Sequence, residues 1–429
     1  MSHAFLGFIL FVGTLKILHD LHHLWCVRTF LRAPRQDVPA ADASLLLLIP
    51  VIREQRVICQ TLSHFLSMDA QHIHLYLAVA GTSREQKITG QQTTKEVVKA
   101  WLHAHPLDGS GIRDLFFCEK EETQGDRATQ LNHAVQSFHA RHPDTQLDYL
   151  GVYDADSLPS VQTLQEVVQI FAQRRDVVAC QQPVHFVRAA NRMAQQGKHP
   201  LLVANALYQS TWTMIRELPS WIENAATLET RMFHENVYLI GHGEFLRMET
   251  YKAFHFPEFE ITDGIQLGYR LGMANQRIAP LYAFCDDDVP QSLSQLIQQH
   301  KRWFGGCMNL VDAFRWARTH FGTCALGQLL DGFWSQACWA WASLTMICAL
   351  LVALACGEPW EIGGILCVIG VYSYLLPALA HRLLPARIHV RLRDWLVLPL
   401  AIALKGIGPN LFLWEKICHR DVVFQKVER

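Results

Sequence analysis

The feature that most constrains the fold is a pair of long uncharged stretches towards the carboxyl end. Phe333 to Cys356 contains 24 residues without a charge, which as a helix is roughly 36 Å, enough to cross a bilayer. Ile362 to Ala380 is a second uncharged stretch of 19 residues, and the acidic, turn-like Gly357 to Glu361 separates the two. A buried core hairpin is the alternative, but soluble helices rarely stay uncharged over such lengths. We therefore predict a transmembrane hairpin over 333–380.

The amino-terminal segment gives a weaker membrane signal. Ala4 to Leu15 is apolar, and Ile17 to Val27 continues the pattern after Lys16, a residue type whose charge can snorkel to the membrane surface. A signal peptide is the alternative, but no basic region precedes the apolar run and no clear cleavage site follows it. We predict a membrane anchor over 1–28, spanning or in-plane, and a linker over 29–44.

The distribution of basic residues predicts the orientation. The hairpin tip has no Lys or Arg, whereas arginines follow both membrane segments: Arg28, Arg32 and Arg35 after the first, and Arg382, Arg387, Arg391 and Arg393 after the second. The positive-inside bias then predicts that residues 28–332 are cytosolic. The net charge of −1 provides no general attraction for nucleic acid. The chain is expected to be an integral membrane protein that contacts membrane lipids and no nucleic acid.

Between the membrane segments, apolar runs alternate with amphipathic stretches. Four short runs are typical of buried strands, and three stretches between them are typical of helices. The expected strands are 45–50, 73–79, 115–118 and 147–153, and the expected helices are 55–67, 93–103 and 128–139. This alternation predicts an α/β domain over 45–310 with a mainly parallel sheet and a ligand site at the carboxyl ends of its strands.

Acidic residues follow the last of these strands. Asp154 and Asp156 come directly after 147–153, and carboxylate oxygens are the ligands that Mg²⁺ or Mn²⁺ prefers. The alternative is structural, because Asp-rich turns often cap helices. Asp286 to Asp288 is a second acidic candidate, which we expect to end a strand.

Two further segments carry candidate site residues. Asp263 precedes the helical Leu267 to Arg270, where it is either a helix cap or a general base. Gln299 to Trp303 offers an amide, a guanidinium suited to phosphate and an aromatic ring within five residues. An ordinary amphipathic helix at the membrane is the alternative for this segment.

In their order and spacing these segments resemble the membrane-associated family 2 glycosyltransferases, which include cellulose, chitin and hyaluronan synthases and ceramide glucosyltransferases. The resemblance extends from about residue 45 to 306 and rests on six motifs. They are Pro50–Glu54 (PVxxE), Gly125–Asn132 (G-[KR]-A-x-x-LN), Asp154–Asp156 (DxD), Gly241–Gly243 (G-x-G), Thr262-Asp263 ([ED]D) and Gln299–Trp303 (QxxRW).

The resemblance implies a cytosolic GT-A domain, with a Rossmann-like sheet, that transfers a sugar from a nucleotide-diphospho-sugar with inversion and requires Mg²⁺ or Mn²⁺. It implies that Asp156 binds the metal, Asp154 the donor sugar or ribose, and that Asp263 is the general base. It also implies the remaining substrate contacts: Arg302 and Gln299 on the diphosphate, Trp303 near the acceptor, and Glu54 and Arg127 along the nucleotide.

This chain departs from the family pattern at two positions. The acidic residue that usually follows the second strand and touches the nucleotide base is absent from 78–85, so the contact is expected to fall to Thr82 or Glu85. This leaves the base open, although we expect a UDP-sugar. Thr262 replaces the usual Glu before the general base, which predicts one carboxylate fewer beside Asp263.

Three functions remain open from the sequence. The leading hypothesis is transfer to a lipid or lipid-linked acceptor at the cytosolic leaflet. A processive polysaccharide synthase of the same family is the second, although few membrane segments make a wide channel harder to build. A non-catalytic membrane scaffold with a degenerate transferase fold is the third, and the acidic residue missing from 78–85 is its only support.

The remaining segments carry structural predictions. Residues 311–332 are expected to form one amphipathic interface helix, and 381–429 a basic loop, an apolar segment and a tail. We expect 395–414 to be an in-plane or re-entrant segment, with Lys405 reaching the headgroups, because a spanning helix would carry the basic tail outside. The ending Phe424–Arg429 looks like the cytosolic ending of some family members. The histidines at 19, 22, 23, 72 and 74 are interpreted as structural, since no Cys or carboxylate spacing completes a zinc site.

Overall fold

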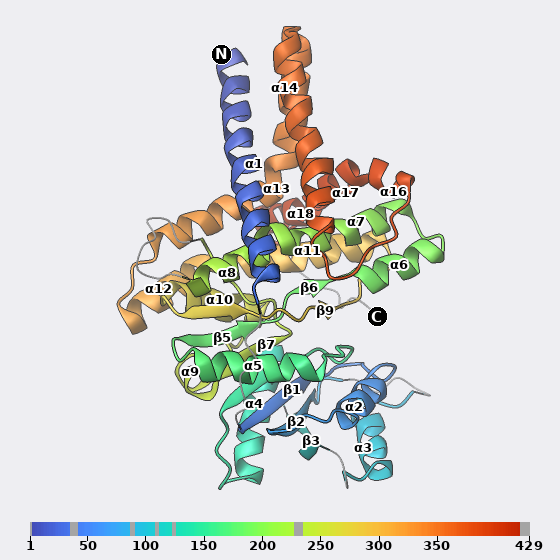
Figure 1. The fold of residues 1–429 in the computed structure, drawn as a ribbon, viewed down its shortest axis with the longest axis vertical. Coiled ribbons are helices and arrows are strands. Elements are labelled where there is room, and N and C mark those ends of the chain that lie inside the picture. The colour runs from blue at the N-terminus through green and yellow to red at the C-terminus, as the bar shows by residue number, and fades with distance from the viewer. Residues whose placement is uncertain are drawn as a thin grey trace.

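The computed structural model describes residues 2–34, 42–85, 91–107, 111–121, 126–226 and 235–420. Arg35, Gly125 and the ending Phe424–Arg429 lie outside these ranges. A seven-stranded sheet forms the lower half of the molecule (Figure 1), in the order β3-β2-β1-β4-β7-β5-β8. Its strands are β1 (Ala43–Pro50), β2 (Ile73–Thr82), β3 (Ile112–Lys120), β4 (Tyr149–Val152), β5 (Val177–Gln181), β7 (Glu244–Arg247) and β8 (Arg277–Pro280).

The sheet is mainly parallel, as predicted. Only β7 runs antiparallel to its neighbours β4 and β5. The four strands and three helices expected between 45 and 153 are all present. The helices among them are α2 (Ile58–Leu66), α3 (Thr94–Ala104) and α4 (Arg127–Arg141), and α5 (Val161–Gln173) follows β4.

The continuous apolar run of β1 is explained by helices on both faces of the sheet. Leu45, Leu47 and Ile49 point to one face and pack in a core with α2, α3 and α5. Leu46 and Leu48 point to the other face and pack with α4. Successive strand side chains alternate between faces, so a strand that is covered on both sides is apolar at every position.

Helices cover the upper edge of this domain and carry most of the cavity described below. They are α6 (Val187–Gln195), α7 (Pro200–Trp212), η1 (Thr213–Glu217), α8 (Leu218–Ala226), α10 (Asp263–Met273), α11 (Leu293–Cys307) and α12 (Leu310–Phe321). A small parallel pair, β6 (Val184–His185) and β9 (Cys285–Asp286), lies between them and the large sheet. The short helix α9 (Met248–Phe254) lies lower, against β7 and β4.

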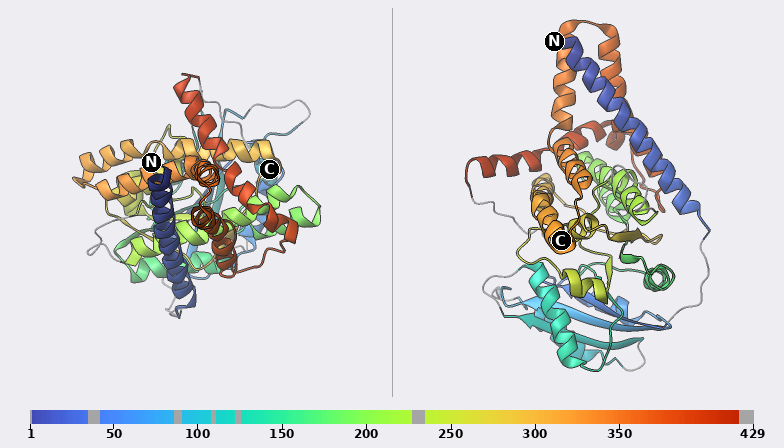
Figure 2. Two further views of the ribbon diagram at one scale, coloured as in Figure 1. Left: turned by 90° about the horizontal axis from the view of Figure 1, so that it is seen from above. Right: turned by 90° about the vertical axis from the view of Figure 1, so that its left-hand side faces the viewer.

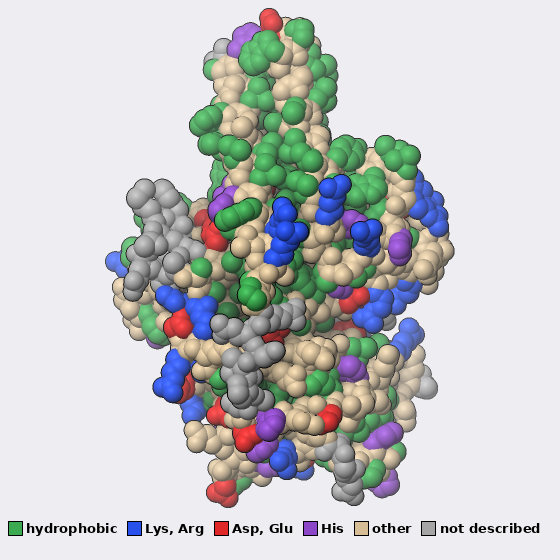
Figure 3. Space-filling view, in the orientation of Figure 1, with side chains coloured by type: hydrophobic (Ala, Val, Ile, Leu, Met, Phe, Trp, Pro, Cys, Tyr) green, Lys and Arg blue, Asp and Glu red, His purple; other side chains and the backbone are tan. Residues whose placement is uncertain are grey.

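Three helical segments of the described chain are long and apolar enough to cross a membrane: α1 (Ser2–Arg32), α13 (Leu326–Cys356) and Pro359–His381. The last comprises α14 (Pro359–Gly370), η2 (Val371–Leu375) and α15 (Leu376–His381). They extend from the same side of the domain (Figures 1 and 2) and show a largely apolar surface (Figure 3). A small core that includes Leu6, Ala353 and Ile365 joins them.

Two carboxyl-terminal expectations are refined. Residues 311–332 do not form one helix, because α12 ends at Phe321 and Gly322 adopts a left-handed conformation (φ 67°) before α13 begins. The segment 395–414 is divided among α16 (Leu392–Leu396), α17 (Leu398–Leu404) and α18 (Ile407–Ile417). These short helices lie across the base of the long helices rather than beside them (Figure 2). No described helix within 395–414 is long enough to be a candidate span.

Candidate active site

One large cavity of about 870 Å³ opens at the carboxyl ends of β1, β2 and β4. Its lower end is lined by Glu54 and Thr82, and its upper end by Tyr208 and Trp339, which belong to α7 and to the long helix α13. The position agrees with the general rule that ligands of parallel sheets bind beyond the carboxyl ends of the strands. The cavity therefore connects the sheet to the helices next to the apolar bundle.

Arg127 joins two of the predicted site carboxylates. It is the first residue of α4, which Asp126 caps. Its Nη1 lies 2.7 Å from Asp263 Oδ2, its Nη2 lies 3.3 Å from Asp154 Oδ1, and Nη2 also donates to the carbonyl of Gly241. Although burial opposes the charge, the two carboxylates raise the pKa of Arg127. The resemblance implied that Arg127 lies along the nucleotide; in the structure it lines the cavity and also fixes the two carboxylates relative to each other.

Asp263 begins α10 after the extended residue Thr262. Only 7% of Asp263 is exposed, and it lines the cavity. The neighbouring backbone is very close, because a Cβ on Gly264 would lie 2.4 Å from Gly241 Cα. Gly241 itself has a φ of 88°, a conformation that favours glycine. The Gly241–Gly243 turn therefore packs closely against Gly264, the residue that follows the candidate base.

Glu244 is a buried carboxyl that the sequence analysis did not select. It follows the Gly241–Gly243 turn at the start of β7, is fully buried, and neither oxygen has a hydrogen-bond partner among the described residues. Burial, and then the Asp263 carboxylate, raise the pKa of Glu244 to about 8. The expectation of one carboxylate fewer beside Asp263 is therefore wrong, because β7 supplies one from a distant part of the sequence. The sequence feature that could have identified Glu244 is its position as an acidic residue directly after a G-x-G turn.

The raised pKa of Glu244 predicts a pH-dependent stability. Between the ordinary value of 4.5 and about 8 the folded chain retains a proton that the unfolded chain has lost. Stability therefore falls as the pH rises through this window. In detergent, without divalent cation or donor, we expect the apparent Tm to fall from about pH 5 to about pH 8, and Glu244→Gln to flatten that decline. The same decline in the Glu244→Gln variant would contradict this assignment.

The acidic residues form a second group beside the first. Asp154 follows β4 and lines the cavity, as does Asp287, which follows β9. Four carboxylates lie close enough to the buried thiol of Cys285 to raise its pKa, after burial itself: Asp287, Asp286, Asp156 and Asp154. Both acidic candidates of the sequence thus contribute residues to the wall of the same cavity, and Asp286 ends a strand as expected.

The residue types of this group suit a hard divalent cation, although among the described residues their oxygens do not converge as closely as the ligand atoms of two other candidate groups do. Its carboxylates supply oxygen ligands, the type that Mg²⁺ and Mn²⁺ prefer. Asp154 and Asp287 border the cavity, while Asp156 is half-buried and is not among the residues that line it. Glu244, with its pKa raised to about 8, adds a largely protonated carboxyl beside Asp263.

Only one of the two residues proposed for the nucleotide base lines the cavity. Thr82, at the end of β2, lines it together with Glu54 and Arg84. Glu85 is instead engaged in the protein, since its Oε1 accepts from Gln55 Nε2 at 2.8 Å and from the backbone N–H of Thr94 at 2.9 Å. The structure places Thr82 and Glu54 where a nucleotide could lie, and Glu85 at the start of α3.

The helix α11 carries the Gln299–Trp303 motif on the opposite wall. Gln299, Arg302 and Trp303 all line the cavity. Close packing holds the helix against the candidate base, because a Cβ on Gly306 would lie 1.9 Å from Thr262 Oγ1. The motif and Asp263 therefore have fixed relative positions.

The upper arm of the cavity contains two residues whose role differs from expectation. Lys405 does not reach towards headgroups. Its Nζ contacts the Tyr208 hydroxyl and lies 5.1 Å from the centre of the Trp212 ring, and burial lowers its pKa to about 8. His300 is 4% exposed, and neither ring nitrogen has a partner among the described residues. This arm thus presents polar groups on an aromatic wall.

Comparisons with known proteins agree with this architecture. A mannosyltransferase from Pyrobaculum calidifontis, PcManGT, in complex with GDP-Man and Mn²⁺, has a similar structure: the TM-score is 0.55, the identity is 18%, and the match covers 96% of this chain and 99% of that chain. S. aureus TarS 1-349 is more distant, with a TM-score of 0.39, 11% identity, and coverage of 90% and 98%. No curated protein matches the sequence.

A protein-family model decides the classification. The model described as "Glycosyltransferase like family 2" matches residues 42–306. This match covers more than half of the chain and contains the sheet, the acidic group, Asp263 and the α11 motif. The chain belongs to the glycosyltransferase like family 2.

Proposed function

We propose that the chain is a membrane-bound, inverting glycosyltransferase that moves a sugar from a nucleotide-diphospho-sugar to a lipid or lipid-linked acceptor at the cytosolic leaflet. The observation that carries the proposal is a single cavity. It contains the candidate base Asp263 and the phosphate-binding candidate Arg302, and it continues upward to Trp339 of α13. The donor and the acceptor could therefore bind in the same cavity.

Asp263 would act as the general base in this reaction. It would take the proton of the acceptor hydroxyl while that oxygen forms a bond to the anomeric carbon of the donor. The bond from this carbon to the diphosphate oxygen breaks on the opposite face, so the configuration inverts and a nucleoside diphosphate leaves. Arg127 Nη1, 2.7 Å from Asp263 Oδ2, holds this carboxylate in position beside the cavity.

The leaving diphosphate needs positive charge. Arg302 and Gln299 on α11 supply a guanidinium and an amide from one wall of the cavity. Asp156, with Asp154 and Asp287, would hold a divalent cation, which when bound supplies further positive charge to the diphosphate. Glu54 and Thr82 would contact the nucleoside at the lower end.

A lipid acceptor is supported by where the cavity leads. Its upper arm is lined by Tyr208, Trp212 and Trp339, beside the helices that are apolar enough to enter a membrane. An acceptor head would need hydrogen-bond donors there, and His300 and Lys405 are available. If the enzyme is a polymerase instead, incubation with radiolabelled donor will give a ladder of long products rather than one lipid-extractable species.

Donor binding can be tested with purified chain in detergent. A panel of nucleotide sugars with Mn²⁺ should include at least one that raises the apparent Tm, because a ligand that binds only the folded state stabilises it. Arg302→Met should reduce this stabilisation. Arg315→Met, on an exposed side chain of α12, is the matched control and should retain it. If no nucleotide sugar stabilises the wild-type chain, the proposal that it binds a nucleotide-sugar donor is contradicted.

The proposed topology predicts which positions an impermeant thiol reagent reaches in intact cells. In a variant lacking Cys418, a cysteine replacing the exposed Glu358 at the hairpin tip should be labelled. A cysteine replacing Arg420 should be labelled only after the cells are permeabilised, since the tail and the catalytic domain would share the cytosolic side. Labelling of position 420 in intact cells would show that the segment 395–414 crosses the membrane.

A further inference from the structure

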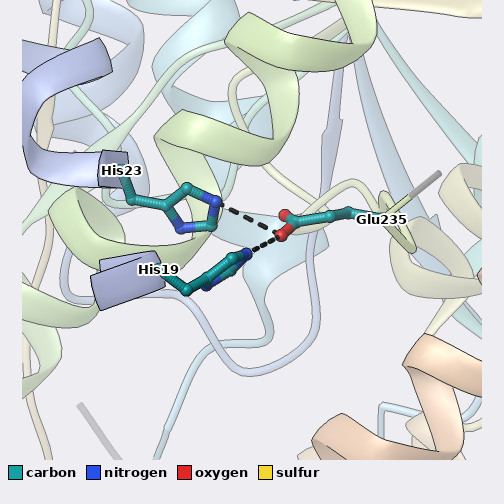
Figure 4. A group of neighbouring side chains, drawn as sticks. All are labelled: His19, His23 and Glu235. Atoms are coloured by element: carbon teal, nitrogen blue, oxygen red, sulfur yellow. Dashed lines mark hydrogen bonds and ion pairs between the residues drawn. The ribbon is translucent and has the colours of Figure 1, made fainter. Parts of the chain in front are cut away.

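A second group of polar side chains lies outside the cavity, where α1 meets α8 and η1. His19 and His23 lie one turn apart on α1 and both face Glu235 (Figure 4). The distances from Glu235 Oε1 are 2.7 Å to His19 Nε2 and 3.2 Å to His23 Nε2. One donor atom from each residue lies within 4.8 Å of the others. The carboxylate that the sequence analysis could not find is thus supplied by a residue 212 positions beyond His23.

The proton on His23 is assigned by its other contact. Its Nδ1 lies 2.8 Å from the carbonyl oxygen of Ile215, and a carbonyl only accepts, so Nδ1 must carry the proton. His23 is fully buried, and its Nε2 has no hydrogen-bond partner among the described residues. That nitrogen either carries a second proton in a buried site or points a lone pair at a carboxylate oxygen. A lone pair facing a carboxylate is repulsive unless a cation lies between them.

His19 shows only part of this arrangement. Its Nε2 lies 2.7 Å from Glu235 Oε1, whereas its Nδ1 lies 3.5 Å from Oδ1 of the buried Asp20 and makes no hydrogen bond among the described residues. An outer acceptor on Nδ1 with an inward-facing Nε2, as on His23, is what histidine ligands of metals show, because the outer contact fixes the tautomer that binds. Glu235 Oε2 also has no hydrogen-bond partner among the described residues.

The distances agree with a small tetrahedral ion. Bonds of about 2.0–2.1 Å place neighbouring ligands of a tetrahedral Zn²⁺ roughly 3.3 Å apart. The 3.2 Å between His23 Nε2 and Glu235 Oε1 is close to this value, and the 2.7 Å from His19 needs only a small side-chain shift. Glu223 Oε1 lies 3.6 Å from His23 Nε2, but it groups with His22 and Cys26 rather than with these three residues.

We propose that His19, His23 and Glu235 form a structural site for a divalent transition metal, with Zn²⁺ as the expected ion. Two imidazoles and a carboxylate favour Zn²⁺ over Mg²⁺, which prefers oxygen ligands alone. The charge of the divalent ion would replace that of up to two imidazolium protons. The ion pair between Arg216 Nη1 and Glu235 Oε1, at 3.2 Å, would therefore be retained. The site is distinct from the acidic group around Cys285.

Such a site would tie the anchor helix to the wall of the cavity. Glu235 is followed directly by Asn236, and Tyr238, Ile240 and Gly241 come next, all of which line the cavity. The carbonyl of Gly241 accepts from Arg127. A metal bound between α1 and Glu235 would therefore hold both the membrane segment and the turn beside the candidate base.

The test is Zn²⁺ binding by the full chain in detergent. The purified protein is stripped with a chelator, dialysed against Zn²⁺ alone and measured by elemental analysis, all in an Asp156→Asn background that weakens the acidic group. We expect about one tightly held equivalent and a Zn²⁺-dependent rise in Tm. Both should be lost in His23→Gln and, should that variant fold poorly, in the half-exposed His19→Gln.

Two controls locate the ion. His72→Gln changes an exposed histidine elsewhere, and Cys26→Ser changes the adjacent group formed by His22, Cys26 and Glu223; both should retain the bound Zn²⁺. Unchanged stoichiometry in His19→Gln and His23→Gln, or no Zn²⁺ bound by the parent, would show that the cluster is held by ion pairs only. Absence of transferase activity from the chain that retains Asp156, with Zn²⁺ binding intact, would count against the proposed function and not against this site.

Discussion

Asp263→Asn is expected to lower kcat by about 10²–10⁴-fold, the usual cost of removing a general base. The amide cannot accept the acceptor proton, but its oxygen can still receive the hydrogen bond from Arg127 Nη1, now 2.7 Å away. The local structure and donor affinity should therefore change little. Turnover of a labelled nucleotide sugar and the donor-induced shift in Tm, measured side by side, separate the two effects.

A matched substitution makes this result interpretable. Asp312→Asn changes an exposed carboxylate on α12 and should leave both quantities unchanged. If Asp263→Asn weakened donor binding and spared turnover, Asp263 would be a binding residue and the base would have to be sought elsewhere. Glu244, buried beside it, would then be the next candidate.

Asp156→Asn is expected to abolish transfer, because a neutral amide is a poor replacement for a carboxylate on a hard cation. Asp154→Asn should also be severe, since that residue lines the cavity and contacts Arg127. The measurement is initial rate against Mg²⁺ or Mn²⁺ concentration. Near-normal turnover with an unchanged metal dependence in Asp156→Asn would remove it from the metal site. A complete loss confined to Asp287→Asn would assign the metal to Asp286–Asp288 rather than to Asp154 and Asp156.

The parts of the fold that were predictable are those in which neighbours in sequence determine the structure. Leu45 to Ile49 is apolar at every position because helices cover both faces of β1, and this pattern is visible in one sequence. The long uncharged stretches within α13 and within 359–381 are likewise visible in the sequence, and they form helices that are long and apolar enough to cross a membrane. The extent of each helix was less predictable: a single left-handed Gly322 divides the segment expected as one amphipathic helix.

The missed contacts in the site join residues far apart in the chain. Arg127 reaches Asp263 across 136 positions, and Lys405 reaches Tyr208 across 197. No local pattern encodes either contact, since both depend on how β7, α10 and α17 are placed by the sheet order and the membrane helices. Glu244 is the clearest case, because its burial beside Asp263 follows from an antiparallel strand inserted into a parallel sheet.

The histidines of α1 illustrate the same limit. Their spacing placed them on one face of a helix but supplied no acidic partner. Only the folded chain brings Glu235 and Glu223 to that face. Local spacing alone could not distinguish a structural cluster from a metal site.

The central claim is that this chain transfers a sugar from a nucleotide donor, and one measurement tests it directly. Purified chain, a mixture of radiolabelled nucleotide sugars, a membrane lipid extract and Mn²⁺ or Mg²⁺ are incubated, and the label in the lipid phase is counted. We expect label that requires the divalent cation and is lost in Asp263→Asn. No consumption of any nucleotide sugar and no labelled product of any length, from a well-folded wild-type chain, would contradict the claim and favour a non-catalytic scaffold.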